Sequence, residues 1–73
     1  MNNPDQPPLY APHQQRVVDE QFELSEKLVK LSEFIDGSPI FGTLPPEERE
    51  RLVRQAVCMT EYSNILLERI AAF

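Results

Sequence analysis

Two segments of this 73-residue sequence space their apolar residues in the same way, by steps of four and then three positions. The first segment has Val17, Gln21, Leu24, Leu28, Leu31 and Ile35, with Gln21 as a polar exception. The second has Leu52, Ala56, Met59, Ser63, Leu66, Ile70 and Phe73. This spacing keeps each set on one face of a helix, where it can pack against a partner helix. We call the two sets together the seam, and they predict an all-α fold, an antiparallel two-helix hairpin.

Prolines and a glycine mark the expected ends of the two helices. Pro12 suits a first helical position, where its missing N–H has no cost. Gly37 is expected to end the first helix in the left-handed conformation, and Pro39 prevents the helix from resuming. The predicted organisation is a helix at about 12–36, a connector at 37–45 and a helix at about 46–72.

The segments outside the predicted helices differ in character. Residues 1–11 contain three of the seven prolines, which predicts a flexible arm. A second interpretation is that the arm orders and Tyr10 folds over a neighbouring surface. The connector is apolar, and we expect Phe41 and Leu44 to fold onto the end of the hairpin core.

The length and the cysteine content restrict how such a hairpin can be stabilised. A chain of this size is below the length at which a single core is comfortably stable. Cys58 is the lone cysteine, so an intramolecular disulfide is impossible, and Cys58 with His13 makes too few ligands for a zinc site. We therefore predict no metal and no cofactor, and we expect the chain to form a homo-oligomer.

Composition also bears on location and partners. The N-terminus has no basic and apolar leader, and no apolar stretch approaches the roughly 20 residues of a membrane helix. Together with the unpaired thiol, this predicts a protein of the reducing cytoplasm. The net charge of −5 argues against binding to duplex DNA or RNA. A small anion can still bind where two or three cations gather.

Beside the seam, each helix carries further apolar residues, displaced in the same sense on both helices. In an antiparallel hairpin these stripes fall on the same side of the pair, where they would merge. We call this set the apolar flank: Val18, Phe22, Val29, Val53, Val57 and Ala71. Soluble monomers rarely expose so large an apolar surface. The apolar flank therefore predicts a dimer that forms a four-helix bundle.

The opposite side of the seam carries polar residues from both helices. We call this set the polar flank: Arg16, Glu20, Lys27, Gln55, Tyr62 and Arg69. One interpretation is a series of salt bridges and hydrogen bonds between the helices. The other is a groove in which arginines bind an anion bidentately and Tyr62 stacks on a planar group. The candidate ligand-binding residues are Arg16, Lys27, Gln55, Tyr62 and Arg69, over which His13 and Tyr10 could close.

No set of residues matches a catalytic arrangement, so we predict that the chain is not an enzyme. Both glycines flank the expected turn and form no phosphate loop. Cys58 and His13 are far apart in the sequence, and Cys58 is better explained as a small apolar residue. Consecutive carboxylates, such as those of Asp19 and Glu20, point about 100° apart on a helix and do not converge.

The runs RVVDEQFELSEKLVKLSEFI and IFGTLPPEERERLVRQAVCMTEYSNILLERI resemble a family of very small phage proteins related to a crAss-like phage protein. The first block of shared positions is Arg16-Val17, Glu20, Glu23-Leu24, Lys27, Lys30-Leu31 and Phe34. The second is Phe41, Leu44, Leu52, Gln55, Met59, Tyr62, Leu66 and Arg69-Ile70. The resemblance covers Arg16 to Phe73 and implies a phage origin.

Two hypotheses about function follow. Small phage proteins often act in counter-defence, and the polar flank would allow this chain to bind and sequester a small anionic nucleotide immune signal. The alternative is a protein-interaction module that inhibits or adapts a host protein. Its contact surface would be the acidic outer face: Asp19, Glu23, Glu26, Glu33 and Glu61.

Overall fold

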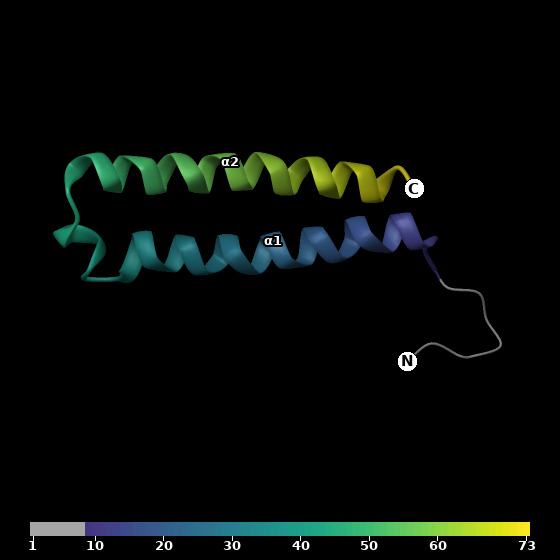
Figure 1. Cartoon of the computed structure of the whole chain (residues 1–73), viewed down its shortest axis with the longest axis horizontal. Coiled ribbons are helices and arrows are strands. Elements are labelled where there is room, and N and C mark those ends of the chain that lie inside the picture. Colours follow the sequence, from purple (N-terminus) through teal and green to yellow (C-terminus); the bar gives the residue numbers. More distant parts are fainter. Residues whose placement is uncertain (1–8) are drawn as a thin grey trace.

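The computed structural model describes residues 9–73, and these residues form two long helices that lie side by side (Figure 1). Helix α1 spans Pro12–Gly37, the short 3-10 helix η1 spans Phe41–Thr43, and helix α2 spans Pro46–Ala71. The predicted all-α, antiparallel hairpin is confirmed. The start of α1 and the C-terminus lie at the same end, which we call the open end (Figure 1). The predicted arm lies outside the described residues, apart from residues 9–11.

Helix α1 begins at a proline and ends before one. At its start, the Gln14 side-chain oxygen accepts a hydrogen bond from the Ala11 backbone N–H at 2.9 Å. At its end, Gly37 remains in the helix and Ser38 takes an extended conformation, with φ −81° and ψ 128°. The expected left-handed conformation of Gly37 is wrong, because no described glycine has a positive φ. Pro39 restricts Ser38 to extended backbone, which ends the helix without a left-handed residue.

The connector folds back against the end of α1. The Ser38 side-chain oxygen accepts a hydrogen bond from the Ile40 backbone N–H at 3.2 Å. The rings of Phe34 and Phe41 meet edge to face, with their centroids 6.0 Å apart. Phe41 and Leu44 are half-buried, whereas Ile40 is exposed. Phe41 therefore covers the connector end of the hairpin, as expected from its apolar character.

Helix α2 has charges that suit its two ends. Pro46 is its first residue, and Glu47 and Glu48 lie in its first turn, where the helix dipole favours negative charge. Arg69 lies in its last turn, where a positive charge is favoured. Within residues 9–73, neither helix has an apolar stretch long enough to cross a membrane.

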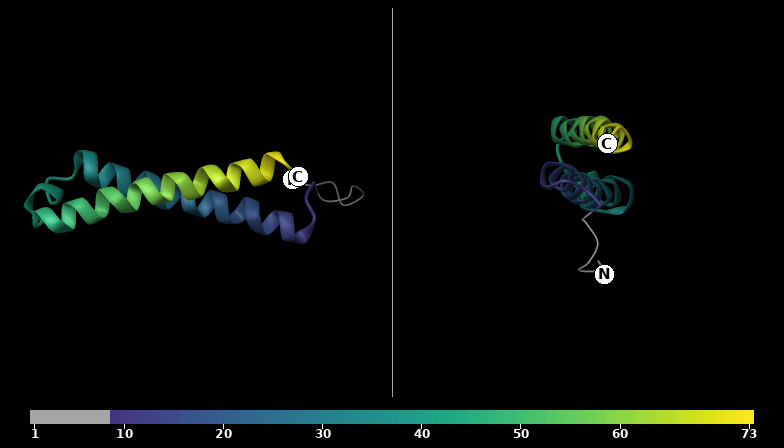
Figure 2. Two further views of the ribbon diagram at one scale, coloured as in Figure 1. Left: turned by 90° about the horizontal axis from the view of Figure 1, so that it is seen from above. Right: turned by 90° about the vertical axis from the view of Figure 1, so that its right-hand side faces the viewer.

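The core lies in the half of the hairpin nearest the open end. Val17, Leu24 and Leu66 are buried, and Met59 and Ile70 pack against them. On the connector side, seam residues such as Leu28, Leu31 and Leu52 are only half-buried. The two helices cross instead of running parallel (Figure 2), so their separation varies along the seam. A single hairpin therefore covers only part of its own seam.

Two contacts near the open end set the alignment of the helices. The Gln21 side-chain N–H donates to Ser63 Oγ at 3.4 Å, so the polar members of the seam meet each other. Ser63 is only 8% exposed, so its hydroxyl has little access to water and depends on the Gln21 side chain for a hydrogen bond. Closer to the chain ends, the rings of Tyr10 and Phe73 meet edge to face at 5.9 Å. These contacts define which residues of α1 and α2 lie at the same level along the hairpin.

Candidate functional site: the polar and apolar flanks

By this alignment, the cations of the polar flank occupy two levels along the hairpin. Arg16 precedes Gln21 by five residues and Arg69 follows Ser63 by six, so these two arginines lie at one level near the open end. The same alignment sets Lys27 near the level of Gln55. Successive residues of a helix rise by about 1.5 Å, so Arg16 and Lys27 are about 16 Å apart along the hairpin.

The cations of the polar flank have no salt-bridge partner within the described residues. The ion pair found in residues 9–73 joins Arg51 and Glu48 at 2.8 Å, within α2. The structure therefore contains no series of cross-helix salt bridges along the polar flank in this part of the chain. Arg16 and Arg69 are both exposed at one level of the hairpin, so two positive charges there have no internal counter-charge among residues 9–73, which favours an external anion.

Aromatic and amide side chains lie close to these cations in the alignment. Tyr62 is 42% exposed and lies near the level of Glu20, between the arginines and Lys27. The Gln55 side-chain N–H contacts Met59 Sδ at 3.8 Å, and Gln55 itself is exposed. The polar flank thus combines cations, an amide and an aromatic face, the groups that bind phosphates and planar rings.

The remaining candidate ligand residues lie at the open end. His13 is exposed, about one turn before Arg16 on α1. Tyr10 is half-buried, because its ring packs against Phe73 at the end of α2. In this structure Tyr10 therefore covers the end of the core, close to the level of the two arginines.

The apolar flank is exposed on the opposite side. Phe22 is 62% exposed and Val57 is 63% exposed, while Val29 and Val53 are each about half exposed. A groove of about 210 Å³ runs between the helices on this side. It is lined by Ser32, Ile35 and Asp36 of α1 and by Val53, Ala56, Val57 and Thr60 of α2. The groove thus contains Val53 and Val57 of the apolar flank and no α1 member of it, so the merging of the two stripes stays a prediction.

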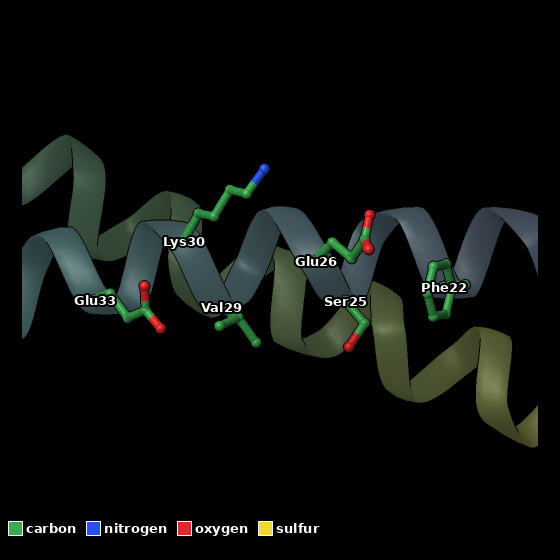
Figure 3. Close-up of a pocket in the computed structure, with 6 residues that line it drawn as sticks. All are labelled: Phe22, Ser25, Glu26, Val29, Lys30 and Glu33. Carbon is green, nitrogen blue, oxygen red and sulfur yellow. The ribbon is translucent and has the colours of Figure 1, made fainter.

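A second hollow, of about 340 Å³, lies along the outer side of α1 next to the apolar flank. Phe22, Ser25 and Val29 follow one another along the helix, and the side chains of Glu26 and Lys30 rise at one border (Figure 3). Glu33 completes the lining. Ser25 is small and lies between Phe22 and Val29 in the sequence, so it leaves space between these two large exposed side chains.

Three features of these surfaces were missed by sequence reasoning. Leu67 is 49% exposed on the same side as Val53 and Val57, and its spacing from them could have revealed it. The small residue Ser25 shapes the hollow on α1. The Nε atom of Arg49 is covered and has no hydrogen-bond partner within the described residues, which only the folded side chain could reveal.

The acidic outer face forms no single charged patch. Its five residues, Asp19, Glu23, Glu26, Glu33 and Glu61, are all exposed. Lys30 stands beside Glu26 and Glu33 in the same hollow, so positive and negative charges alternate there. This mixture is typical of a solvated helix surface.

Comparison with known proteins identifies a family whose model matches most of the chain. The family model described as Sequestin matches residues 11–72. No curated protein and no solved structure matches the chain. The matched range contains both helices, the connector, and every residue of the polar and apolar flanks.

Proposed function

We propose, from the premise that the chain belongs to the Sequestin family, that it is a non-enzymatic phage protein that sequesters a small anionic nucleotide. The ligand would be an immune signal in the cytoplasm of the host cell. The family name supports a sequestering role. The ligand class is supported by one observation above all: Arg16 and Arg69 share a level and are exposed without a salt-bridge partner among residues 9–73.

The chemistry of the polar flank suits a phosphorylated planar ligand. A guanidinium group donates two parallel hydrogen bonds to a phosphate, so Arg16 and Arg69 would hold one phosphate group. Tyr62 would stack on a base, and Gln55 would donate or accept hydrogen bonds at its edge. Lys27 would interact with a second anionic group, about 16 Å along the hairpin from Arg16.

The residues at the open end would complete the site. His13 stands one turn from Arg16 and can donate a hydrogen bond to a phosphate oxygen. Tyr10 packs on Phe73 and would move only a short way to cover a ligand held by the arginines. The net charge of −5 disfavours long nucleic acids, which need an extended basic surface. A small ligand needs only the local cations.

Self-association is the second part of the proposal. The apolar flank, Val18, Phe22, Val29, Val53, Val57 and Ala71, would pack against the same flank of a second copy and complete a four-helix bundle. The half-buried seam residues on the connector side support this arrangement, because one hairpin alone covers them poorly. Full burial of each Val or Phe side chain is worth about 1.5–3 kcal/mol.

Isothermal titration calorimetry of the full chain tests the ligand class. Cyclic dinucleotides, cyclic trinucleotides and ADP-ribose derivatives are the probes, and we expect saturable heat with at least one of them. Absence of heat with all three classes, at concentrations well above micromolar, contradicts the proposal.

The alternative function, inhibition of a host protein through the acidic outer face, is separated by charge reversal. Changing Glu23 and Glu26 to Lys leaves the polar-flank arginines intact and should preserve sequestration. If this variant loses activity in infected cells while a variant with Arg16 and Arg69 changed to Glu remains active, the host-protein function is correct.

A further inference from the structure

We infer that two copies pack antiparallel about a twofold axis at Ser25, with their polar flanks facing away from each other. This inference rests on the self-association proposed above. It adds the relative orientation of the two copies, which the exposure of the apolar flank does not determine by itself. The occupant of the apolar flank is a second copy of this chain, turned end for end.

The first argument is the symmetry of α1 about Ser25. Phe22 lies three residues before Ser25 and Val29 lies four residues after it, while Val18 and Ser32 each lie seven residues away. In an antiparallel pair of α1 helices, Phe22 therefore meets Val29 of the second copy, and this contact occurs twice. Ser25 meets Ser25 of the second copy, where two small side chains permit close approach of the helices.

The hollow on α1 fits this pairing. It lies between Phe22 and Val29, with Ser25 along the border opposite Glu26 and Lys30 (Figure 3). The reversed helix would bring a Phe22 ring to each of the two hollows, so each ring fills space beside Val29. In the parallel arrangement, α1 would face α2 of the second copy, and Phe22 would meet the levels of Thr60 and Asn64. That pairing would set an exposed aromatic ring against polar side chains.

The second argument comes from α2 and is independent of the first. An axis at Ser25 falls, by the Gln21–Ser63 alignment, close to Met59 on α2. Residues equally distant from that point then meet, which brings Arg49 opposite Glu68 of the second copy. Arg49 is half-buried with its Nε covered by the chain itself, and Glu68 is exposed, so the contact would be made by the terminal amino groups of the guanidinium. The axis chosen from α1 thus sets opposite charges at one level of the two α2 helices.

The available area suits a stable dimer. Each helix has 26 residues, so the two-helix face is about 39 Å long. With two helices side by side at about 10 Å each, the face covers about 800 Å² per copy, the usual size of a specific interface. The polar flank lies on the other side of the seam, so the dimer would carry two separate ligand sites, one on each outer side.

Disulfide cross-linking tests the axis without any ligand. In a Cys58→Ser background, Ser25→Cys puts two thiols at the axis, within the roughly 4.4–6.8 Å Cα separation that a disulfide needs. We expect mild oxidation to convert most of this variant to a covalent dimer. The matched control, Glu23→Cys, has its thiol on the polar side of α1 and should remain monomeric on a denaturing gel. Cross-linking of Glu23→Cys but not of Ser25→Cys overturns the inference. The inference is also wrong if Ser25→Cys forms a disulfide only when it is mixed with Thr60→Cys, because that result indicates the parallel arrangement.

A charge exchange tests the Arg49–Glu68 contact in solution. Arg49→Glu and Glu68→Arg should each weaken dimerisation by roughly tenfold, since each variant affects two contacts per dimer. The double variant should restore the dimer, because each exchanged pair is again of opposite charge. A double variant as weak as the single ones contradicts the antiparallel pairing. If both tests give the antiparallel dimer but the chain gives no heat with nucleotides, the proposed nucleotide binding is contradicted and this inference still holds.

Discussion

The polar flank and the apolar flank lie on opposite sides of one seam, and both leave large side chains in solvent. On the apolar flank, Phe22 and Val57 are more than 60% exposed. On the polar flank, Arg16 and Arg69 share a level without a salt bridge among residues 9–73. One side lacks apolar cover and the other lacks counter-charge. This difference is the reason why we propose two different kinds of partner, a second copy for one flank and an anion for the other.

The largest expected effect comes from placing a charge on the apolar flank. Phe22→Glu removes the burial of an aromatic side chain, worth about 1.5–3 kcal/mol, from each copy and adds a charge that cannot be desolvated cheaply. We expect loss of the dimer at micromolar concentration, together with most of the helical circular-dichroism signal. Sedimentation equilibrium and circular dichroism measure the two effects.

Ile65→Glu is the matched control for this prediction. Ile65 is 49% exposed and lies outside the apolar flank, so the same change of apolar residue to acid should leave the dimer intact. Equal damage from both substitutions would mean that the apolar flank has no special role, and a folded wild-type monomer at micromolar concentration would refute dimerisation directly.

A smaller effect is expected when the charge of the polar flank is reversed. Changing Arg16 and Arg69 to Glu removes two charged hydrogen-bond donors, each worth about 1.5–3 kcal/mol, so nucleotide affinity should fall by at least about a hundredfold. Calorimetry measures the affinity, and sedimentation should find the dimer unchanged. Arg54→Glu is the control, because it alters an exposed cation outside the polar flank. If that control loses as much affinity, the binding depends on net charge and not on this site.

The aromatic part of the polar flank has a more moderate expected effect. Tyr62→Ala removes a stacking surface worth about 1–3 kcal/mol per base, which corresponds to a loss of affinity of about tenfold to a hundredfold. Tyr62→Phe retains the ring and should bind nearly as well as the wild type. Calorimetry with the same ligand distinguishes them, and a Phe variant as weak as the Ala variant would assign the role to the hydroxyl instead.

The smallest effect concerns neither flank and provides a baseline for both. Gly37 lies in α1 with ordinary helical backbone, and a Cβ there would have nothing within 4 Å. Gly37→Ala should therefore raise the free energy of unfolding by about 0.5–1 kcal/mol, as measured by urea denaturation at fixed protein concentration. Dimerisation and nucleotide binding should not change, and a loss of stability would show that this residue needs a conformation that only glycine adopts.

The spacing of apolar residues was enough to predict the hairpin. This works because a helix converts steps of four and three residues into one face, and an antiparallel turn leaves little freedom in pairing the faces. The same reasoning gave the levels of Arg16 and Arg69. It could not give the crossing of the helices, which makes Leu66 1% exposed while Leu28 and Leu52 remain half-buried.

Other misses depend on side chains and neighbours. The sequence allows salt bridges along the polar flank, but exposed ion pairs gain little, and the side chains adopt none there within residues 9–73. A glycine at the end of a helix usually indicates a left-handed cap. Here Pro39 restricts Ser38 to extended backbone, so the helix ends without a left-handed Gly37. In both cases a second, local interaction decides the outcome.

The position of the buried core has a kinetic consequence. The Gln21–Ser63 contact joins residues 42 positions apart, whereas the poorly buried part of the seam lies close to the turn. Closing the longer loop costs only roughly 1 kcal/mol more entropy than closing a loop near the turn, but it must be completed before the best contacts form. Arg16 and Arg69 lie beyond this contact, so they come together late in folding. A ligand bound between them should therefore slow unfolding of the hairpin and leave its folding rate nearly unchanged.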